Sequence, residues 1–360
     1  MKRILVTGAG GAPATNFVRS LRLDKSDSYH IVGVDADKYY LQRAETDEKF
    51  LAPVCSDPLY IPFLNSIIEE TKCELLFAQP DVEIAYLSEH RDDMKCAVFL
   101  PAKETVRICQ DKYLSFACWK KAGLTVPETM MIANEDDLKQ ALKELGPVIW
   151  IRATEGAFGK GSLPTNDFVQ AKAWLDFQKG WGTYSAAQCL RPDSVTWQSI
   201  WNNGELVVAQ GRKRLYWEFA NRSPSGITGI TGTGVTVSDS VLDDLAVKAI
   251  HAIDEHPHGI FSVDMTYDNA GKPNPTEINI GRFFTTHLFF SAAGLNMPAM
   301  YVKLALGEQL EALPQKINPL PEGLAWVRGM DREPVLTTID AIQKEVERME
   351  ERKQHLTPRS

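Results

Sequence analysis

The sequence predicts an α/β fold with more than one domain, on the basis of three observations. The chain has 360 residues, more than the roughly 250–300 that a single hydrophobic core usually supports. It opens on a short apolar run, residues 3–7, followed by three glycines and an amphipathic pattern, which is typical of a β-α-β unit. Two later segments, residues 196–211 and 259–282, each hold two strand-like runs around turn residues. We therefore expect two or three domains.

The composition narrows the class of protein. Hydrophobic residues make up 44% of the chain and charged residues 24%, as in ordinary globular proteins. The net charge of −8 argues against a nucleic-acid partner, because binding to phosphates needs an excess of Lys and Arg. The six cysteines are scattered without a C-x-x-C pair, which suggests reduced thiols in the cytoplasm. No apolar run approaches the roughly 18 residues of a membrane span, and the short N-terminal run is interpreted as a strand rather than a signal sequence.

The N-terminal region predicts a doubly wound, Rossmann-like sheet. A strand at residues 3–7 is followed by a helix at 16–23 and a second strand at 30–34 that ends in Asp35. The dinucleotide fingerprint G-x-G-x-x-G is incomplete, because Pro13 stands where the third glycine should be. Binding of a nicotinamide cofactor therefore stays a minor alternative, and the glycines otherwise serve a tight turn.

A third strand, residues 75–78, is followed by polar side chains that are candidates for substrate contact. These are Gln79, Asp81 and Glu83. Open α/β sheets bind ligands at the carboxyl ends of their strands, where these residues are expected to lie. The alternative is that they only cap the next helix.

The middle of the chain carries basic residues near glycines. Lys112 lies within a helix expected over residues 102–122, and Arg152 lies near the end of a strand at 146–152. Residues 155–162 form a glycine-rich loop in which Lys160 supplies a point charge, and such loops can fold over phosphates. Taken alone, Lys112 reads as a solvated lysine and the loop as a hairpin turn.

A basic cluster at residues 212–214 precedes a glycine-rich run at 226–234. The run is too rich in glycine for a core strand and is expected to form a loop near the active site. Arg214 and its neighbours then have two interpretations. They hold an acidic substrate or a phosphate in the transition state, or they are a solvated group of charges.

The hairpin at residues 259–282 is the strongest candidate for chemistry. Asp264 lies on its first strand, while Glu277 and Asn279 lie two residues apart on the return strand and so share a face. Two carboxylates and an amide are costly to bury unpaired, and hard oxygen ligands of this kind suit Mg²⁺. The alternative is a surface hairpin whose polar residues face water.

These motifs resemble those of the ATP-grasp superfamily. Its metal site combines an acidic residue on one strand with an E-x-N-x-R pattern on the next, here Asp264 followed by Glu277, Asn279 and Arg282. Gly281 is one residue more than the family pattern contains. Five motifs occur in the order of the family: Asp111-Lys112 with the later G-x-x-x-P at 123–127, the strand that ends at Arg152, the loop that carries Lys160, the hinge around 186–190, and the metal site. The resemblance covers roughly residues 1–310 and is greatest to the branch that contains the carbamoyl phosphate synthase large subunit.

The resemblance implies roles for individual residues. Asp264, Glu277 and Asn279 would bind Mg²⁺, with Mn²⁺ as a substitute. The nucleotide ATP would be bound by Lys112, Arg152, Lys160, Gln188, Leu190 and Asp193, the first three at the phosphates and the others around the adenosine. Arg282, Lys160 and Arg214 would act in catalysis.

The resemblance also implies a domain arrangement. A Rossmann-like domain at residues 1–105 would precede an ATP-grasp domain at 106–310, whose two α+β lobes are 106–190 and 191–310. Residues 311–360 would add a strand, expected over 326–335, and a charged terminal helix. That helix is expected either to pack on another subunit, giving a homodimer, or to cap its own domain.

The activity implied by the resemblance is an ATP- and Mg²⁺-dependent ligase. It would activate a small-molecule carboxylate as an acylphosphate and join it to an amine, without nucleic-acid or membrane partners. Two alternatives keep the nucleotide: a kinase that forms an acyl or carbamoyl phosphate, and a non-catalytic nucleotide-binding protein. A nicotinamide-dependent dehydrogenase is the fourth hypothesis.

Overall fold

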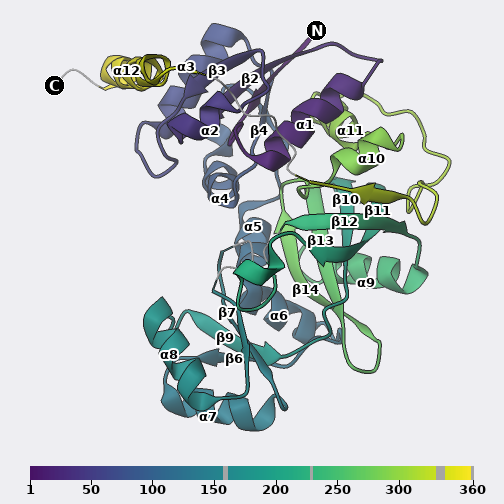
Figure 1. The fold of residues 1–360 in the computed structure, drawn as a ribbon. Coiled ribbons are helices and arrows are strands. Elements are labelled where there is room, and N and C mark those ends of the chain that lie inside the picture. Colours follow the sequence, from purple (N-terminus) through teal and green to yellow (C-terminus); the bar gives the residue numbers. More distant parts are fainter. Residues whose placement is uncertain (157–160, 228–229, 330–336, 358–360) are drawn as a thin grey trace.

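The computed structural model describes the 360-residue chain apart from residues 157–160, 228–229, 330–336 and 358–360. Within the described residues the named strands form three sheets, and these follow one another along the sequence. The sheet formed by the N-terminal strands lies at one end of the molecule, the third sheet lies in the middle, and the second sheet lies at the other end (Figure 1). The fold is therefore mixed α/β with several sheets.

The first sheet is parallel, with strand order β3-β2-β1-β4-β5. Its strands are β1 (Lys2–Val6), β2 (Tyr29–Asp35), β3 (Glu48–Leu51), β4 (Leu75–Phe77) and β5 (Ala97–Val98). The helices between them are α1 (Ala12–Leu23), α2 (Lys38–Gln42), α3 (Tyr60–Thr71) and α4 (Asp81–Glu89). The three strands and one helix predicted for this region are confirmed, with small shifts of their ends. The strand order reverses between β1 and β4, which is the position where open α/β sheets typically bind ligands.

The second sheet is antiparallel and has its own core. Its order is β6-β9-β7-β8, with β6 (Thr129–Ile132), β7 (Ile149–Ala153), β8 (Leu163–Thr165) and β9 (Tyr184–Gln188). Helices α7 (Glu135–Glu144) and α8 (Phe168–Gln178) cover it. Ile149, Ile151 and Ala186 of the sheet pack with Leu138 and Leu175 of the helices in a separate hydrophobic cluster.

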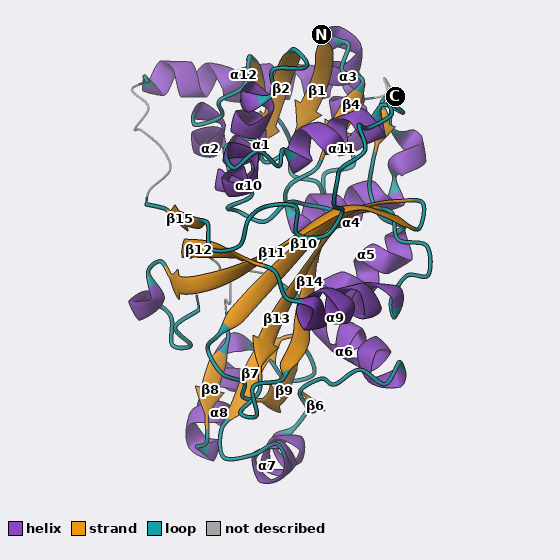
Figure 2. Cartoon of the chain, turned by 90° about the vertical axis from the view of Figure 1, so that its right-hand side faces the viewer, coloured by secondary structure: helices purple, strands orange, loops and turns teal. Residues whose placement is uncertain are grey.

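The third sheet holds both predicted hairpins. Its order is β14-β13-β10-β11-β12-β15, and every neighbouring pair is antiparallel. The strands are β10 (Ser194–Asn202), β11 (Glu205–Trp217), β12 (Thr231–Val237), β13 (Gly259–Tyr267), β14 (Pro273–Ile280) and β15 (Ala325–Val327). Helices α9 (Ser240–His251), α10 (Leu288–Ala292) and α11 (Met297–Ala305) pack around it (Figure 2). The predicted hairpins occur as the pairs β10–β11 and β13–β14.

The third sheet and the first sheet share hydrophobic cores. Phe17 and Phe77 of the N-terminal part stack with ring centroids 3.8 Å apart, and Phe283 and Tyr301 from the far end of the chain pack against them. Because these side chains come from both parts, the two parts are held by apolar burial rather than by a linker alone.

The single helix expected over residues 102–122 is wrong. The structure has two helices, α5 (Lys103–Gln110) and α6 (Lys112–Lys121), with Asp111 between them in an extended conformation. The Asp111 carboxylate accepts hydrogen bonds from the backbone N–H groups of Tyr113 and Leu114 and so starts the second helix. Lys112 consequently occupies the first turn of α6, where its own N–H donates to the carbonyl of Thr154 at 2.8 Å.

The glycine-rich run at 226–234 is only in part the loop that the composition predicted: Gly226 and Ile227 lie outside any strand and line the cavity described below. Its last residues, from Thr231, belong to β12, while residues 228–229 lie outside the described part. The glycines make room for side chains of the neighbouring strand β11. A Cβ atom on Gly232 would lie 2.1 Å from the Tyr216 ring, and one on Gly234 would lie 2.7 Å from Cδ of Arg212. Composition alone misled here because the reason for these glycines lies on another strand.

The end of the chain returns to the first sheet. The strand expected over residues 326–335 is present only as β15, and residues 330–336 lie outside the described part. Helix α12 (Ile339–Leu356) packs beside β3 and α3 and is fixed there by ion pairs of Arg352 with Glu70 and of Lys353 with Asp57. In this chain the helix thus covers its own N-terminal part. Among the described helices none is long and apolar enough to cross a membrane.

Several polar side chains are buried at the carboxyl ends of β1 and β4. The Glu83 side chain lies on α4, and its Oε2 has no hydrogen-bond partner among the described residues. Burial raises the pKa of the Glu83 carboxyl to about 7; the Thr7 hydroxyl opposes this shift and the charge of Asp35 adds to it. The Glu83 carboxyl is therefore buried in the protein and is not presented to a substrate.

Gly10→Ala tests the close packing of the glycine turn. A Cβ atom at this position would lie 2.0 Å from the carbonyl oxygen of Tyr40, so the backbone must shift. We expect the free energy of unfolding to fall by about 1–3 kcal/mol, as for other overpacked sites, measured by urea denaturation. Gly329→Ala is the control, because nothing lies within 4 Å of the added atom. Equal unfolding midpoints for Gly10→Ala and the wild type would contradict the packing described for this turn.

Glu83→Gln tests the buried carboxyl. Its pKa of about 7 in the folded protein lies above the usual 4.5, so the stability it contributes is complete below pH 4.5 and is lost as the pH rises to 7. Glutamine does not titrate. The free energy of unfolding of the variant relative to the wild type should therefore be about 3 kcal/mol higher at pH 8 than at pH 4.5. Urea unfolding at both pH values measures this. Glu89→Gln, at the exposed end of the same helix, should keep the wild-type pH dependence. The interpretation fails if Glu83→Gln keeps it too.

Candidate active site

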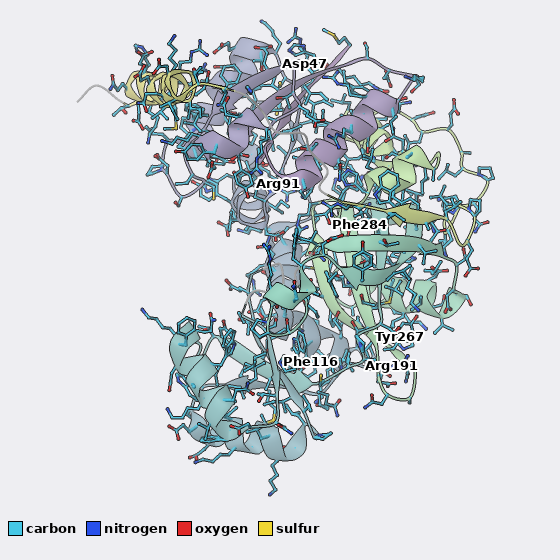
Figure 3. The ribbon with its side chains drawn as sticks, in the orientation of Figure 1. Asp47, Arg91, Phe116, Arg191, Tyr267 and Phe284 are labelled. Atoms are coloured by element: carbon cyan, nitrogen blue, oxygen red, sulfur yellow. The ribbon has the colours of Figure 1, made fainter. Side chains whose placement is uncertain are left out.

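A cavity of about 510 Å³ lies between the second and third sheets. Its walls come from the ends of β7 and β9 on one side and from β10 to β14 on the other, with α6 and the segment after β14 closing it. Two of its lining residues, Phe284 and Arg191, are labelled in Figure 3 on the part of the molecule formed by the third sheet. Most of the residues predicted to be functional line this cavity.

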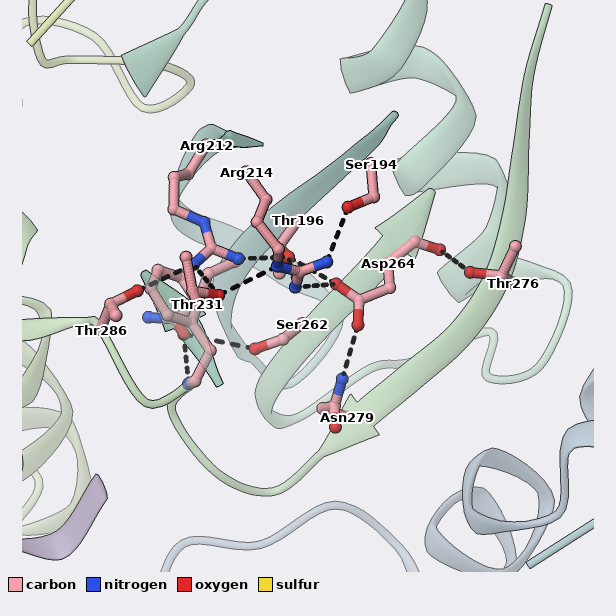
Figure 4. A network of polar contacts seen from close by, with 12 residues as sticks. Ser194, Thr196, Arg212, Arg214, Thr231, Ser262, Asp264, Thr276, Asn279 and Thr286 are labelled. Atoms are coloured by element: carbon pink, nitrogen blue, oxygen red, sulfur yellow. Dashed lines mark hydrogen bonds and ion pairs between the residues drawn. The ribbon is translucent and has the colours of Figure 1, made fainter. Parts of the chain in front are cut away.

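The acidic centre of the cavity is produced by the pairing of β13 with β14. Asp264 stands opposite Glu277, and Ser262 stands opposite Asn279. The Asp264 carboxylate accepts hydrogen bonds from the Thr196 hydroxyl and, at 3.2 Å, from the Asn279 amide (Figure 4). Burial raises the pKa of Asp264, and the nearby Arg214 opposes that shift. The structure therefore brings together the three residues that the hairpin pattern proposed as metal ligands.

Two basic side chains face the acidic centre from the second sheet and α6. Lys112 Nζ lies 3.8 Å from Glu277 Oε2 and donates to the Gly156 carbonyl at 2.6 Å. Arg152 donates to the Thr276 carbonyl at 3.1 Å, while its Nε has no partner among the described residues. Burial lowers the pKa of both side chains, and the charge of Glu277 opposes the shift in each. Both are placed to meet an anion that enters between the sheets.

Arg282 reaches the cavity despite the additional residue before it. Gly281 adopts φ +72°, the left-handed region that favours glycine, and turns the chain out of β14. The Arg282 guanidinium then donates to both oxygens of Asp81 on α4, with Nη2 at 3.1 Å from Oδ2, and to Asn279 Oδ1 at 2.8 Å. Although burial opposes it, the charge of Asp81 raises the pKa of Arg282. Gln79, Asp81 and Glu83 were the candidates for substrate contact. Among the described hydrogen bonds, those of Asp81 with Arg282 are the ones that join a side chain of this group to a residue that lines the cavity.

Arg214 lies on the opposite side of the acidic centre, together with Arg212. Arg214 donates to the Ser194 hydroxyl at 2.6 Å and to the Thr231 hydroxyl at 2.9 Å, and its Nη2 lies 3.9 Å from Asp264. Arg212 donates to the hydroxyls of Thr196 at 2.7 Å and Thr286 at 2.8 Å. Burial lowers the pKa of Arg212 to about 9, and the charge of Arg214 adds to the shift.

Sequence reasoning grouped these basic residues without separating them. The signal that separates them is the two-residue period of a strand, which puts residues 212 and 214 on one face and Lys213 on the other. Lys213 points away from the cavity wall toward Asp193, at 3.8 Å.

The other end of the cavity is more apolar. Pro127, Trp150, Ala187 and Leu190 line it, and Gln188 lies at the end of β9, where its side chain accepts the N–H of Glu128 at 3.0 Å. Trp150 was not singled out from the sequence, because the strand around it was analysed only for Arg152.

Two residues expected to contact the nucleotide, Asp193 and Lys160, are not among the described residues that line the cavity. Asp193 is not among the described lining residues, although Pro192 and Ser194 on either side of it are, and it pairs with Arg191 at 2.8 Å. Lys160 lies outside the described residues. Gly156 and Ser162, which flank the undescribed segment, both line the cavity.

The donor set for a metal consists of two carboxylates and an amide oxygen. Within the described ranges no group of three or more His, Cys, Asp and Glu side chains is placed to hold a metal ion. Asp264, Glu277 and Asn279 are hard oxygen donors of the kind Mg²⁺ takes when substrate phosphates and water complete its shell. Their chemistry therefore fits Mg²⁺ better than zinc, which favours nitrogen and sulfur ligands.

Comparison with known sequences gives one kind of relative. No family model matches the chain. The carbamoyl phosphate synthase large chain of Thermotoga petrophila is 26% identical over 347 residues, which is 88% of this chain, and that of Pseudothermotoga lettingae is 24% identical over 348 residues. The chain spans about 30% of the length of these relatives.

Comparison with solved structures gives several enzymes with similar folds. The biotin carboxylase domain of 2-oxoglutarate carboxylase from Hydrogenobacter thermophilus has a TM-score of 0.69 at 15% identity, with 90% of this chain and 73% of that chain covered. A biotin carboxylase–β-γ-ATP complex from Campylobacter jejuni has a TM-score of 0.67 at 18% identity, covering 86% and 72%. N5-carboxyaminoimidazole synthetase from Staphylococcus aureus has a TM-score of 0.64 at 14% identity, covering 86% and 78%.

These structures and sequences are those of ATP-grasp enzymes. They agree with the resemblance drawn from the order of the motifs, from Lys112 to Arg282. The chain therefore has the ATP-grasp fold, and over most of its length it resembles one segment of the carbamoyl phosphate synthase large chain.

Proposed function

We propose that this protein is an ATP- and Mg²⁺-dependent ligase that activates a carboxylate as an acylphosphate and joins it to an amine. One observation carries the proposal. Asp264, Glu277 and Asn279 meet on one wall of a cavity that basic side chains enter from three sides. A site with this charge pattern suits phosphoryl transfer, in which the protein mainly positions the reactants and stabilises charge.

The metal would be held by the acidic centre. Asp264 and Glu277 offer carboxylate oxygens, and Asn279 offers the amide oxygen that Arg282 now contacts. When bound there, Mg²⁺ would supply positive charge to the phosphate oxygens of the nucleotide, and Mn²⁺ would substitute for it.

The phosphates of ATP are assigned to the basic side chains opposite this centre. Lys112 and Arg152 flank Glu277, and the unpartnered Nε of Arg152 is a donor ready for a phosphate oxygen. We assign Lys160 to the same group from the sequence motif alone.

The adenosine is assigned to the apolar end of the cavity. Leu190, Trp150 and Pro127 offer apolar surface, and Gln188 lies beside the backbone that would meet the base edge. Asp193 would contact the ribose only after giving up its pairing with Arg191 and Lys213.

We assign the N-terminal part to the binding of a substrate other than ATP. We propose that residues 1–105 form a Rossmann-like domain before an ATP-grasp domain at 106–310, with residues 311–360 as an extension. The strand order of the first sheet supports this, as does the contact of Asp81 with Arg282, because it puts the carboxyl ends of β1 and β4 beside the cavity.

The reaction then has two steps. A carboxylate oxygen attacks the γ-phosphorus of ATP, and the bond to the β,γ-bridging oxygen breaks to release ADP. The amine nitrogen next attacks the acyl carbon, loses a proton, and expels phosphate. Arg214 and Arg282 lie on either side of Asp264 and are placed to stabilise the negative oxygens of both steps.

A kinase that stops at an acyl or carbamoyl phosphate is the second candidate. The relatives favour it, because they are large chains of carbamoyl phosphate synthase, whose name gives carbamoyl phosphate as the product. The two functions differ only in whether an amine is needed for turnover.

Glu277→Gln tests the proposal. The substitution keeps the shape of the side chain but removes one of two carboxylates of the acidic centre. We expect acid-dependent release of phosphate from ATP to fall by roughly 100-fold or more, as when one electrostatic partner of a transition state is removed. Glu205→Gln, at the exposed start of β11, should keep wild-type turnover.

Hydroxylamine trapping separates the two candidate functions. Hydroxylamine converts an acylphosphate to a hydroxamate and so shows that the acylphosphate forms. In parallel reactions without hydroxylamine, ADP release that needs no added amine favours the kinase. ADP release that depends on an added amine favours the ligase. Full activity of Glu277→Gln in both assays would rule out the site described above.

A further inference from the structure

We infer that Arg212 and Arg214 form the receptor for the acid substrate, and that this receptor selects acids without an ammonium group beside the reacting carboxylate. The inference rests on the proposed function, because it concerns the acid that such a ligase would activate. It is argued from how the positive charges of the cavity are neutralised.

The basic residues of the cavity divide into two groups by their partners. Arg282 donates to the Asp81 carboxylate at 3.1 Å, so its charge is neutralised by a carboxylate outside the proposed metal centre. Arg212 and Arg214 instead donate to hydroxyl oxygens, which carry no formal charge. These belong to Ser194, Thr196, Thr231 and Thr286. The carboxylate nearest to this pair is Asp264, 3.9 Å from Arg214, and it belongs to the proposed metal centre.

The two guanidinium groups are buried and held in fixed orientations. Arg212 is 1% exposed and the Arg214 side chain is 8% exposed. The Arg214 guanidinium lies over the Trp217 ring at 3.6 Å, and that of Arg212 lies over the Phe284 ring at 4.5 Å. Arg212 Nε has no partner among the described residues. Buried charges are costly when no carboxylate is hydrogen-bonded to them, so an anion that binds here regains part of that cost.

The receptor adjoins the acidic centre. The Thr196 hydroxyl donates to Asp264 and accepts from Arg212, so a single side chain separates the two groups (Figure 4). Thr286 contacts Arg212 and belongs to the same short segment as Arg282. A carboxylate between Arg212 and Arg214 would therefore lie beside the oxygens that are assigned to the metal and to the γ-phosphate.

The same arrangement excludes an α-ammonium group. Such a group lies next to its own carboxylate and would face two guanidinium groups. The carboxylates of this wall are already committed, Asp264 and Glu277 to the metal centre and Asp81 to Arg282. Glu155, the remaining acidic residue among the described lining residues, follows β7 on the opposite sheet. Like-charge repulsion without a compensating carboxylate disfavours α-amino acids as the activated acid.

Matched pairs of acids test the selectivity. Propionate is compared with alanine, succinate with aspartate and glutarate with glutamate, each with ATP, Mg²⁺ and hydroxylamine as the common nucleophile. Hydroxamate formation reports activation of the carboxylate itself, so an amino acid cannot score through its amine. We expect kcat/KM to be at least about tenfold higher for the acid without the ammonium group in each pair that turns over. Preference for the amino acid would overturn the inference.

Variants on β11 test the receptor. Arg214→Gln should raise KM for the best acid by about tenfold or more, because a charged hydrogen bond contributes roughly 1.5–3 kcal/mol. The affinity for a non-hydrolysable ATP analogue should change less than twofold. Lys213→Gln is the matched control, since Lys213 lies between the two arginines but points away from the cavity. Equal acid KM in Arg214→Gln and the wild type would overturn the assignment.

The receptor remains testable if no acid turns over. With the ATP analogue and Mg²⁺ bound, succinate should raise the Tm of the wild type and of Lys213→Gln, but not of Arg214→Gln. Such a shift without turnover would reject the ligase while keeping the anion receptor. No shift with any of the six acids would reject the receptor. Arg214→Lys is a second variant of the receptor; because it retains the charge, it should raise the acid KM less than Arg214→Gln does.

Discussion

The site depends on the register of β13 against β14. Because Asp264 stands opposite Glu277 and Ser262 opposite Asn279, the three polar ligands project from one face of the sheet into the cavity. A slip of β14 by one residue would turn all of its side chains to the opposite face and separate Glu277 and Asn279 from Asp264. The register is fixed by the turn, where the Asp268 carboxylate accepts the N–H groups of Ala270 and Lys272, and by the burial of neighbours such as Val263.

This constraint puts two half-buried carboxylates side by side, and the rest of the cavity compensates for their charge. Lys112 approaches Glu277 from α6 and Arg152 from the second sheet, while Arg214 approaches Asp264 along the third sheet. The positive side chains come from separate parts of the chain, so the charge balance holds only when the two sheets face each other. The third sheet is in turn joined to the first by shared aromatic packing.

The sequence carried enough information for the local features and not for the ones set across strands. Asp264, Glu277 and Asn279 could be grouped because the two-residue period and a clear turn act over short distances. Arg212 could not be separated from Lys213 until it was known which face of β11 is turned to the cavity. The break at Asp111 was missed because a capping carboxylate inside an apolar pattern resembles an ordinary helical residue. The strand β12 was missed because its glycines accommodate Arg212 and Tyr216 from the neighbouring strand.

Gly281 shows the same principle at the site itself. By the sequence pattern it was an additional residue that put the position of Arg282 in question. Its positive φ lets the chain leave β14 at an angle, and Arg282 thereby reaches Asp81 on α4. The Asp81 carboxylate neutralises Arg282, whereas Arg212 and Arg214 on the other side of the acidic centre have only hydroxyl partners and a carboxylate 3.9 Å away. One glycine thus helps to pair Arg282 with a carboxylate, while Arg212 and Arg214 donate to hydroxyl oxygens.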